Sequence, residues 1–214
     1  MRFVLVSTVA FVSAAHAATI NVGNEGFGGG QNNWPGGEPP SAVIDGAGQK
    51  YLNFGGENTG IVVTPTAGGI PASITAWAAN DAIERDPASF WLGGTNGDSV
   101  TGDYTFIAGG LLSLPDTRNA GAAAELLEQN SFSVSFDNSA SFTSYLVVFP
   151  TLKNAGAANS MQVADVQLFD AAGTGIFAPG DTILGVQVDG ALVPEPSTGL
   201  LAFLGLAGLL RRRR

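Results

Sequence analysis

The stretch that decides the fold is the apolar run Tyr145-Leu146-Val147-Val148-Phe149, which Pro150 closes. An apolar run this short, ended by a proline, is typical of a central strand. Elsewhere, short apolar segments are separated by Gly, Asn, Asp and Pro, and the chain holds 30 glycines and 11 prolines among its 214 residues. This pattern predicts an all-β fold, either a sandwich or a barrel.

Other segments have the alternation of half-buried strands. Phe132, Val134 and Phe136 share one face, as the two-residue period of a strand requires. Residues 18–192 are predicted to form one domain with a core at about 25–170, a length that is ample for a single core. Further strands are predicted at 60–64, 73–79, 89–92 and 104–108, a short helix at 122–129, and at 183–188 either a last strand or a ribbon added beside the domain.

The segment 161–169 changes its apolar phase. Met161 and Val163 share one face, but the apolar positions then shift to Val166 and Leu168. A two-residue period changes phase where one residue is inserted, so we predict a β-bulge at the two residues between these pairs.

The N-terminal end has the pattern of a secretory signal peptide. Arg2 precedes an apolar run at 3–12, and small residues follow up to Ala15-His16-Ala17. A charged start, an apolar centre and an Ala-x-Ala site predict cleavage after Ala17. The run is too short for a membrane anchor, which needs about 20 residues.

The C-terminal end has three parts. Pro194-Glu195-Pro196 is stiff, because each proline fixes its own φ and favours an extended residue before it. Residues 199–210 carry no polar side chain, and residues 211–214 are all arginine. The apolar run is shorter than the ~20 residues that span a bilayer, and the arginines resist translocation. We therefore predict a short transmembrane helix suited to a temporary hold.

This order of parts resembles the PEP-CTERM sorting signal, over residues 193–214. The resemblance implies that an exosortase-type membrane protease recognises the sorting motif Pro194, Glu195 and Pro196 and removes the residues after it. It also implies transient insertion in the inner membrane, and a cell-surface or extracellular-matrix location after processing. Proteins with this signal are associated with exopolysaccharide and biofilm formation.

Without its two ends the chain is strongly acidic. Five of the nine Lys and Arg residues lie in the ends, so residues 18–192 hold four basic residues against 17 acidic ones, a net charge near −13. Nucleic acid is not an expected partner, because phosphate binding needs clustered Lys and Arg. An acidic domain favours hard cations such as calcium.

The residue types also limit the possible chemistry. The chain has no cysteine, and its one histidine, His16, lies in the predicted signal peptide. Ser-His-Asp and Cys-His mechanisms and the usual zinc sites are therefore excluded for the domain. Only carboxylate chemistry remains open to an enzyme, and a glycosidase would need two carboxylates opposed across a cleft, which the sequence does not predict.

Several phrases in the middle of the chain resemble a galactose-binding-like, discoidin-type β-sandwich, which is a jelly-roll. In that family an Asp-Gly loop precedes an aromatic strand, a Gly-Ser/Thr-Asn turn follows a central strand, and Ala-Glu-Ile/Val closes the domain. The resemblance spans roughly residues 25–170 and rests on residues 43–46, 50–54, 79–87, 92–97, 145–150 and 164–168.

The same resemblance implies a structural calcium ion, whose carboxylate ligands come from the Asp-Gly loop and the closing strand. These positions correspond to Asp45 and Asp165. Calcium takes roughly six to eight oxygens, and the region 42–49 can supply backbone carbonyls. The sequence departs from the family in two ways: Asp165 replaces the usual Glu, and the loop is one residue short, with Gln49 nearest to the usual Thr. The alternative is that Asp45 caps a turn and Asp165 accepts backbone hydrogen bonds at the bulge.

The segment 80–87 concentrates three carboxylates and one arginine. Asp81, Glu84 and Arg85 are candidate ligand-binding residues, because such groups exchange hydrogen bonds with sugar hydroxyls. The alternative is structural, with Arg85 bridging Glu84 or Asp86 to pin the loop.

The leading hypothesis is a secreted, non-enzymatic surface protein that binds carbohydrate or extracellular polysaccharide. Trp34, in the Gly-rich opening loop, is the candidate platform for a sugar ring, against the alternative of half-buried packing. Two other hypotheses remain open: a structural matrix protein without a specific ligand, and a carboxylate-based glycoside hydrolase.

Overall fold

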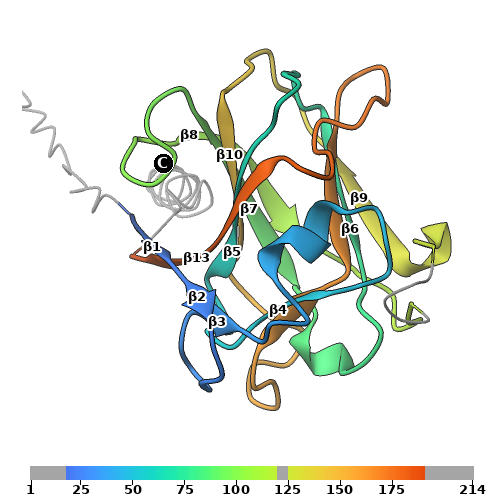
Figure 1. The fold of residues 1–214 in the computed structure, drawn as a ribbon. Coiled ribbons are helices and arrows are strands. Elements are labelled where there is room, and N and C mark those ends of the chain that lie inside the picture. The colour runs from blue at the N-terminus through green and yellow to red at the C-terminus, as the bar shows by residue number, and fades with distance from the viewer. Residues whose placement is uncertain (1–17, 120–124, 191–214) are drawn as a thin grey trace, which may run out of the picture.

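A six-stranded antiparallel sheet forms one layer of the computed structural model, which describes residues 18–119 and 125–190 (Figure 1). The strand order is β1-β13-β5-β10-β7-β8. These strands are β1 (Thr19–Val22), β5 (Thr59–Thr64), β7 (Ser89–Thr95), β8 (Thr105–Leu111), β10 (Ser144–Phe149) and β13 (Thr182–Asp189).

The predicted central strand is confirmed as β10. Val147 pairs with Ile61 of β5 on one side and with Leu92 of β7 on the other, and every residue of β10 is buried. β5 approaches β10 so closely at Gly60 that a Cβ there would collide with the carbonyl oxygen of Val147. The strand contact therefore requires glycine at this position.

Two smaller sheets form the second layer. One has the order β12-β6-β9, and the other pairs β11 with β4. Their strands are β4 (Tyr51–Asn53), β6 (Ser73–Trp77), β9 (Ser131–Ser135), β11 (Met161–Val163) and β12 (Asp165–Phe169). The remaining elements are a short parallel pair, β2 (Asn24–Glu25) and β3 (Asn33–Trp34), and the 3-10 turns η1 (Pro40–Ile44), η2 (Ile83–Arg85) and η3 (Glu128–Asn130).

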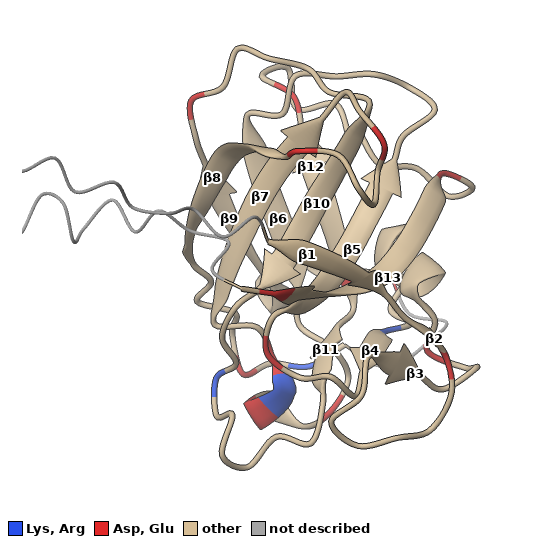
Figure 2. Cartoon of the chain, turned by 90° about the vertical axis from the view of Figure 1, so that its left-hand side faces the viewer, with Lys and Arg blue, Asp and Glu red and all other residues tan. Residues whose placement is uncertain are grey.

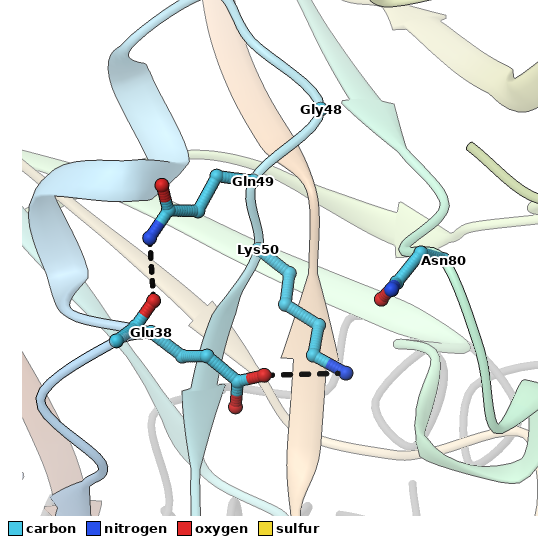
Figure 3. A pocket seen from close by; sticks show the side chains of 6 residues that line it. Glu38, Gly48, Gln49, Lys50 and Asn80 are labelled. Atoms are coloured by element: carbon cyan, nitrogen blue, oxygen red, sulfur yellow. Dashed lines mark hydrogen bonds and ion pairs between the residues drawn. The ribbon is translucent and has the colours of Figure 1, made fainter. Parts of the chain in front are cut away.

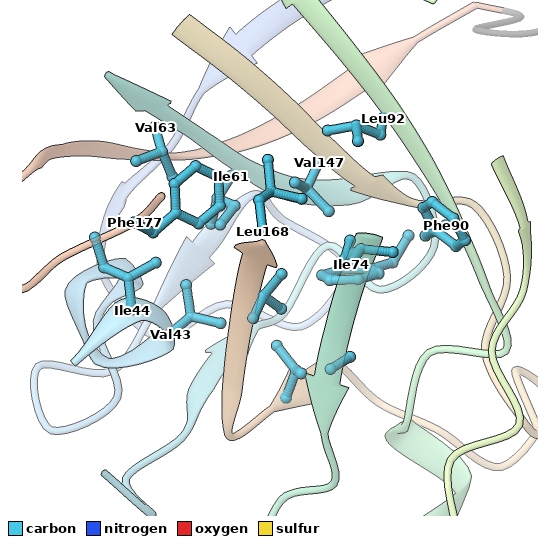
Figure 4. Packing of buried hydrophobic residues seen from close by; sticks show 14 of the residues in the cluster. Val43, Ile44, Ile61, Val63, Ile74, Phe90, Leu92, Val147, Leu168 and Phe177 are labelled. Carbon is cyan, nitrogen blue, oxygen red and sulfur yellow. The ribbon is translucent and has the colours of Figure 1, made fainter. Parts of the chain in front are cut away.

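The main hydrophobic core lies between these two layers (Figure 4). Val147 and Leu92 from the large sheet pack in one cluster with Ile74 of β6 and Leu168 of β12. Sheets packed face to face over a shared core form a sandwich. The predicted all-β sandwich is therefore confirmed.

The phase change in segment 161–169 has a different cause from the predicted bulge. The chain pairs with β4 through Val163, bends at Ala164, and then pairs with β6 from Asp165 onward. Ala164 keeps the contact through its amide, which donates to the carbonyl of Trp77 at 2.9 Å. Because each half faces the core from its own sheet, both apolar pairs are buried despite the shift.

A second hydrophobic cluster lies on the opposite face of the large sheet. Alternation along β10 points Leu146 and Val148 away from the main core. We call this group the outer cluster; its buried members are Val62, Trp91, Leu146, Val148, Val186 and Val188.

The domain extends beyond the predicted core of residues 25–170. β1 and β13 both belong to the large sheet, and Gln187 of β13 pairs with Thr59 of β5. The segment predicted at 183–188 is therefore an integral strand, not an added ribbon. The described part of the predicted helix at 122–129 holds an isolated bridge at Glu125 and the start of η3, so the helix is wrong there.

The predicted targeting segments lie outside the described residues: the signal peptide at 1–17, and the sorting signal with its transmembrane helix at 193–214. No helix within the described ranges is long and apolar enough to cross a membrane.

Candidate functional site

A shallow polar pocket lies where three loops meet (Figure 3). The loops are those before η1, between η1 and β4, and after β6. The pocket volume is about 90 Å³, enough for several water molecules or one edge of a sugar ring. Its lining residues are Gly37, Glu38, Gly48, Gln49, Lys50 and Asn80.

Lys50 connects the loops around the pocket through ion pairs with Glu38 and Asp81. Its side chain is buried, and its ammonium lies 2.7 Å from Asp81 Oδ1 and 3.5 Å from Glu38 Oε1. Partial burial alone would raise the pKa of Asp81, but the hydrogen bond and charge of Lys50 hold that pKa below its usual value. Asp81 is therefore ionised at neutral pH and can accept hydrogen bonds. Gln49 is fixed by its side-chain amide, which donates to the carbonyl of Gly37.

The turn beside the pocket is strained. Ala82 has φ +40° and ψ 70°, a left-handed conformation that non-glycine residues rarely adopt. Gln162, which is fully buried, holds this turn by donating its side-chain amide to the carbonyls of Asp81 and Ala82. Strain that the surroundings enforce is often found at functional sites, so this turn supports the pocket as a candidate site.

Of the four predicted ligand-binding residues, only Asp81 is connected to the pocket. It accepts a hydrogen bond from the ammonium of Lys50, which lines the pocket. Glu84 lies in η2, where its carbonyl accepts from the amide of Asn154 at 3.1 Å. Trp34 is half-buried against the main core, with its ring edge-on to Tyr51 at a centroid distance of 6.1 Å. Their roles in ligand binding stay predictions.

The structural alternative, in which Arg85 forms an ion pair with Glu84 or Asp86, is wrong for the described residues. Asp86 is fully buried, and its ion-pair partners are Arg118, through two hydrogen bonds of 2.8 Å, and Lys153 at 3.1 Å. The Nε atom of Arg85 is buried and has no hydrogen-bond partner in the described part of the chain. Arg118 lies 32 positions from Asp86, so spacing along the sequence did not reveal the pair.

The predicted metal ligands lie together. Asp165 is 2% exposed and its Oδ2 accepts from the amide of Gly46 at 2.9 Å, while Asp45 Oδ1 accepts from the amide of Ala47 at 2.8 Å. Burial, with a smaller contribution from the nearby charge of Asp45, raises the pKa of Asp165 to about 7, although the hydrogen bond from the Gly46 amide opposes the rise. The two carboxylates thus lie close together, with Asp165 buried and Asp45 half-buried.

This pair has the donor chemistry that calcium takes, because a hard cation would relieve the repulsion between the two carboxylates. Among the described residues no three His, Cys, Asp or Glu side chains gather as a metal site. Backbone carbonyls and water would have to complete the shell. The hydrogen bonds that Asp45 and Asp165 accept from the backbone amides of Ala47 and Gly46 are those of the alternative, in which Asp45 caps a turn and Asp165 is a backbone acceptor.

The sequence did not predict the other pocket residues as ligand-binding residues. Glu38, Gln49 and Asn80 come from separate loops, and only the folded chain brings them to Lys50. Asn80 is the first residue of the acidic segment 80–87, which also contains Asp81. Of these three residues, it is therefore the one that a sequence signal could have identified.

A family model described as the PEP-CTERM protein-sorting motif matches residues 192–214. The chain carries a PEP-CTERM sorting motif. This confirms the resemblance seen in the sequence. The PEP-CTERM motif indicates a secreted protein that is sorted to the cell surface. No curated protein is significantly similar to the chain.

Solved structures similar to this chain include family 32 carbohydrate-binding modules. The module of NanJ from C. perfringens, in complex with galactose, is 14% identical, with a TM-score of 0.42, and covers 71% of this chain and 90% of that chain. The module of EndoD from Streptococcus pneumoniae is 10% identical, with a TM-score of 0.45, and covers 72% and 95%. A Clostridium perfringens module in complex with GalNAc-beta-1,3-galactose is 11% identical, with a TM-score of 0.43, and covers 71% and 93%.

Proposed function

We propose that this protein is a non-enzymatic surface protein whose β-sandwich binds carbohydrate, and that the ligand is an extracellular polysaccharide. The observation that carries the proposal is the polar pocket, in which the buried ammonium of Lys50 holds two carboxylates beside the amide groups of Gln49 and Asn80. Sugar hydroxyls both donate and accept hydrogen bonds, so a mixture of fixed donors and acceptors suits them.

The electrostatics of the pocket support binding over hydrolysis. A glycosidase needs one carboxylic acid that stays protonated, which requires a raised pKa. The Lys50 ammonium instead lies between Glu38 and Asp81 and lowers the pKa of Asp81. The chain also has no histidine after residue 16 and no cysteine that could replace the acid.

A second contact for a longer sugar chain is available at the far end of β4. Phe27 is 84% exposed and packs at a centroid distance of 6.2 Å from Phe54, which follows β4, whereas Lys50 precedes it. β4 has three residues, so the two ends lie ~10 Å apart. The exposed face of Phe27 is suited to stacking on a sugar ring.

Two further parts of the proposal concern a structural metal ion and the processing of the tail. Asp45 and Asp165 bind a structural calcium ion that fixes the loop after η1 against β12. An exosortase-type protease recognises Pro194-Glu195-Pro196 and releases the domain to the cell surface or matrix. The calcium proposal rests on the neighbouring carboxylates of Asp45 and Asp165, and the processing proposal rests on the sorting motif.

The test uses two matched asparagines. Asn80 lines the pocket and Asn154 lies on an exposed loop outside it. Asn80→Ala should weaken binding to the native exopolysaccharide about tenfold, the effect of one lost hydrogen bond, while Asn154→Ala should leave binding unchanged. Isothermal titration with purified polysaccharide, after a glycan array to choose it, makes the measurement.

The other outcomes are also informative. If the wild type binds no glycan, the matrix protein without a specific ligand is the better description. If the wild type shortens the polysaccharide, a glycoside hydrolase is the better description. If both asparagine variants bind as the wild type does, carbohydrate binds elsewhere than the pocket.

A further inference from the structure

Strand β8 forms one edge of the large sheet and leaves part of its backbone unpaired (Figure 2). Its neighbour in the sheet is β7, and the amide of Leu112, just past β8, donates to the carbonyl of Ala88 at 2.9 Å. Because hydrogen bonding alternates along an antiparallel strand, Gly109 and Leu111 point their amides and carbonyls away from β7. No backbone hydrogen bond among the described residues reaches β8 from a strand other than β7.

The opposite edge of the same sheet is covered. β1 lies there, and the side-chain amide of Asn32 donates to the carbonyl of Asn21 at 2.7 Å. Proteins usually protect an edge by such a cover, by charged residues or by proline. β8 contains neither a charged residue nor a proline, so it is tan throughout in Figure 2. Its one irregularity is a bulge at Ile107, which leaves residues 108–111 in regular pairing.

Two exposed apolar side chains lie on one face of this edge. Phe106 is 46% exposed and Leu111 is 75% exposed. Trp91 pairs with Gly109 and its ring lies 5.9 Å from that of Phe106, so Phe106 and Gly109 share the face of the outer cluster. Leu111 lies two residues after Gly109 and therefore points to the same side. Unlike the outer cluster, both side chains keep apolar surface that a partner can cover.

We propose that β8 pairs with β8 of a second copy of this chain, antiparallel and about a two-fold axis at Gly109. A strand that pairs with its own copy in this way exchanges both backbone hydrogen bonds at the central residue. Ile107 and Leu111 are equally far from Gly109 along the strand. Leu111 of each copy then lies beside Phe106 and Ile107 of the other, so the exposed apolar side chains cover one another.

The charge of the domain favours a second copy at this edge over a basic partner. Residues 18–192 carry a net charge near −13, so two copies repel each other over most of their surface. Residues 104–115, which contain β8, hold no charged residue, and Asp103 and Asp116 lie outside the strand. A basic protein would be attracted to the acidic surface elsewhere. At β8, two acidic chains meet without placing like charges opposite each other.

The pairing would join two large sheets into one continuous sheet of twelve strands, six from each copy. β8 has seven residues and is ~23 Å long, so a single pair of strands makes a small contact of the weak, transient class. A dimer would carry two polar pockets, and a polymer bound at both would be held more tightly than at one. The pairing itself does not rest on carbohydrate binding, because the edge and the pocket share no residue.

The chain lacks cysteine, so one introduced cysteine reports the contact. A central pair that exchanges both hydrogen bonds has a Cα–Cα distance of ~5.5 Å, which a disulfide can bridge. Gly109→Cys, in protein purified from the secreting host, should therefore give a covalent dimer on oxidation. The matched control is Ser135→Cys, at an exposed position of the edge strand β9, which should give about tenfold less dimer. Equal yields would overturn the proposal.

A second measurement does not depend on the cysteine variants. Sedimentation velocity over a range of concentrations should show the wild type passing from monomer to dimer, and added salt should strengthen the dimer by screening like charges. Leu111→Asp should weaken the dimer about tenfold or more, because the new carboxylate would lose water against apolar residues of the other copy. Ile70→Asp, at an exposed aliphatic residue between β5 and β6, should leave the dimer unchanged.

The remaining outcomes of the sedimentation experiment also decide the proposal. A wild type that stays monomeric at every concentration, or a dimer that Leu111→Asp leaves unchanged, would overturn it. If the wild type is monomeric and Leu111→Asp loses polysaccharide binding, the edge binds carbohydrate and not a second copy.

Discussion

The ammonium of Lys50 lies 2.7 Å from Asp81 Oδ1 and so joins the loop before β4 to the turn after β6. The two residues are 31 positions apart, and Asp81 precedes the strained Ala82. One ion pair thus fixes both walls of the polar pocket. Because the Lys50 side chain is buried, the pair is less exposed to solvent than a surface salt bridge.

Lys50→Met should abolish the arrangement of the pocket while keeping the aliphatic stem. We expect the pKa of Asp81 to rise, because its hydrogen bond and its nearest positive charge are lost, and carbohydrate binding to fall more than tenfold. Carbon-13 NMR titration of the Asp81 carboxyl group measures the first effect and calorimetry the second. Lys50→Arg keeps the charge and should retain part of both, whereas an unshifted Asp81 titration in Lys50→Met would contradict the pairing.

The buried pair of Asp86 and Arg118 should contribute more to stability than any other ion pair described. Arg118→Met leaves Asp86 fully buried with Lys153 alone, so unfolding free energy should fall by about 3 kcal/mol, the low end for a broken buried pair. Arg85→Met, which removes the neighbouring arginine without an ion pair, should cost less than about 1 kcal/mol. Urea denaturation of both variants compares them, and equal losses would disprove the assignment.

Calcium should stabilise the domain if Asp45 and Asp165 bind it together. A metal that binds only the folded state adds ~2.7 kcal/mol at a hundred times its Kd. For a domain of this size that is a rise in Tm of roughly 5–10 °C over chelator-treated protein. Asp165→Asn should remove most of this response without unfolding the protein, and magnesium should restore it poorly. An unchanged melting curve after metal stripping would contradict calcium binding. Asp45 and Asp165 would then only accept hydrogen bonds, at a turn and at the start of a strand.

In metal-free buffer, Asp165 should make stability depend on pH. Its pKa is about 7 in the folded state, where burial is the main cause, against an ordinary value of 3.8. The folded state therefore binds more protons between these values, and unfolding free energy should fall as pH rises from about 4 to 7. At ~1.4 kcal/mol per pH unit the loss is at most ~4 kcal/mol. Asp165→Asn should flatten this slope in melting curves across the range, and Asp137→Asn, at an exposed loop, should not.

The sorting motif should be required for processing of the tail. Deletion of Pro194-Glu195-Pro196 in an exosortase-containing host should leave the full C-terminus on the protein, because the recognised stiff segment is gone. Mass spectrometry of the cell-associated protein detects the retained residues. Deletion of residues 190–192 shortens the same connection without touching the motif and should still be processed. Normal processing of the first deletion would refute the role of the motif.

Much of this protein was determined by the sequence alone. The apolar run at 145–149, the alternation at 132–136 and the many glycines and prolines predicted the all-β sandwich, because strand periodicity and turn chemistry are local properties. The sorting motif is likewise local, because it consists of consecutive residues at 192–214. The absence of cysteine, and of histidine after residue 16, excluded whole classes of chemistry.

The tertiary structure decided which distant residues meet. Arg118, not the adjacent Arg85, pairs with Asp86, because the folded chain brings the segment after β8 against the residue that follows η2. The chain switches sheets at Ala164, which a phase change alone could not distinguish from a bulge. Ion pairs, pocket walls and sheet exchange depend on positions in space that local periodicity does not encode, so the polar pocket around Lys50 became visible only in the folded chain.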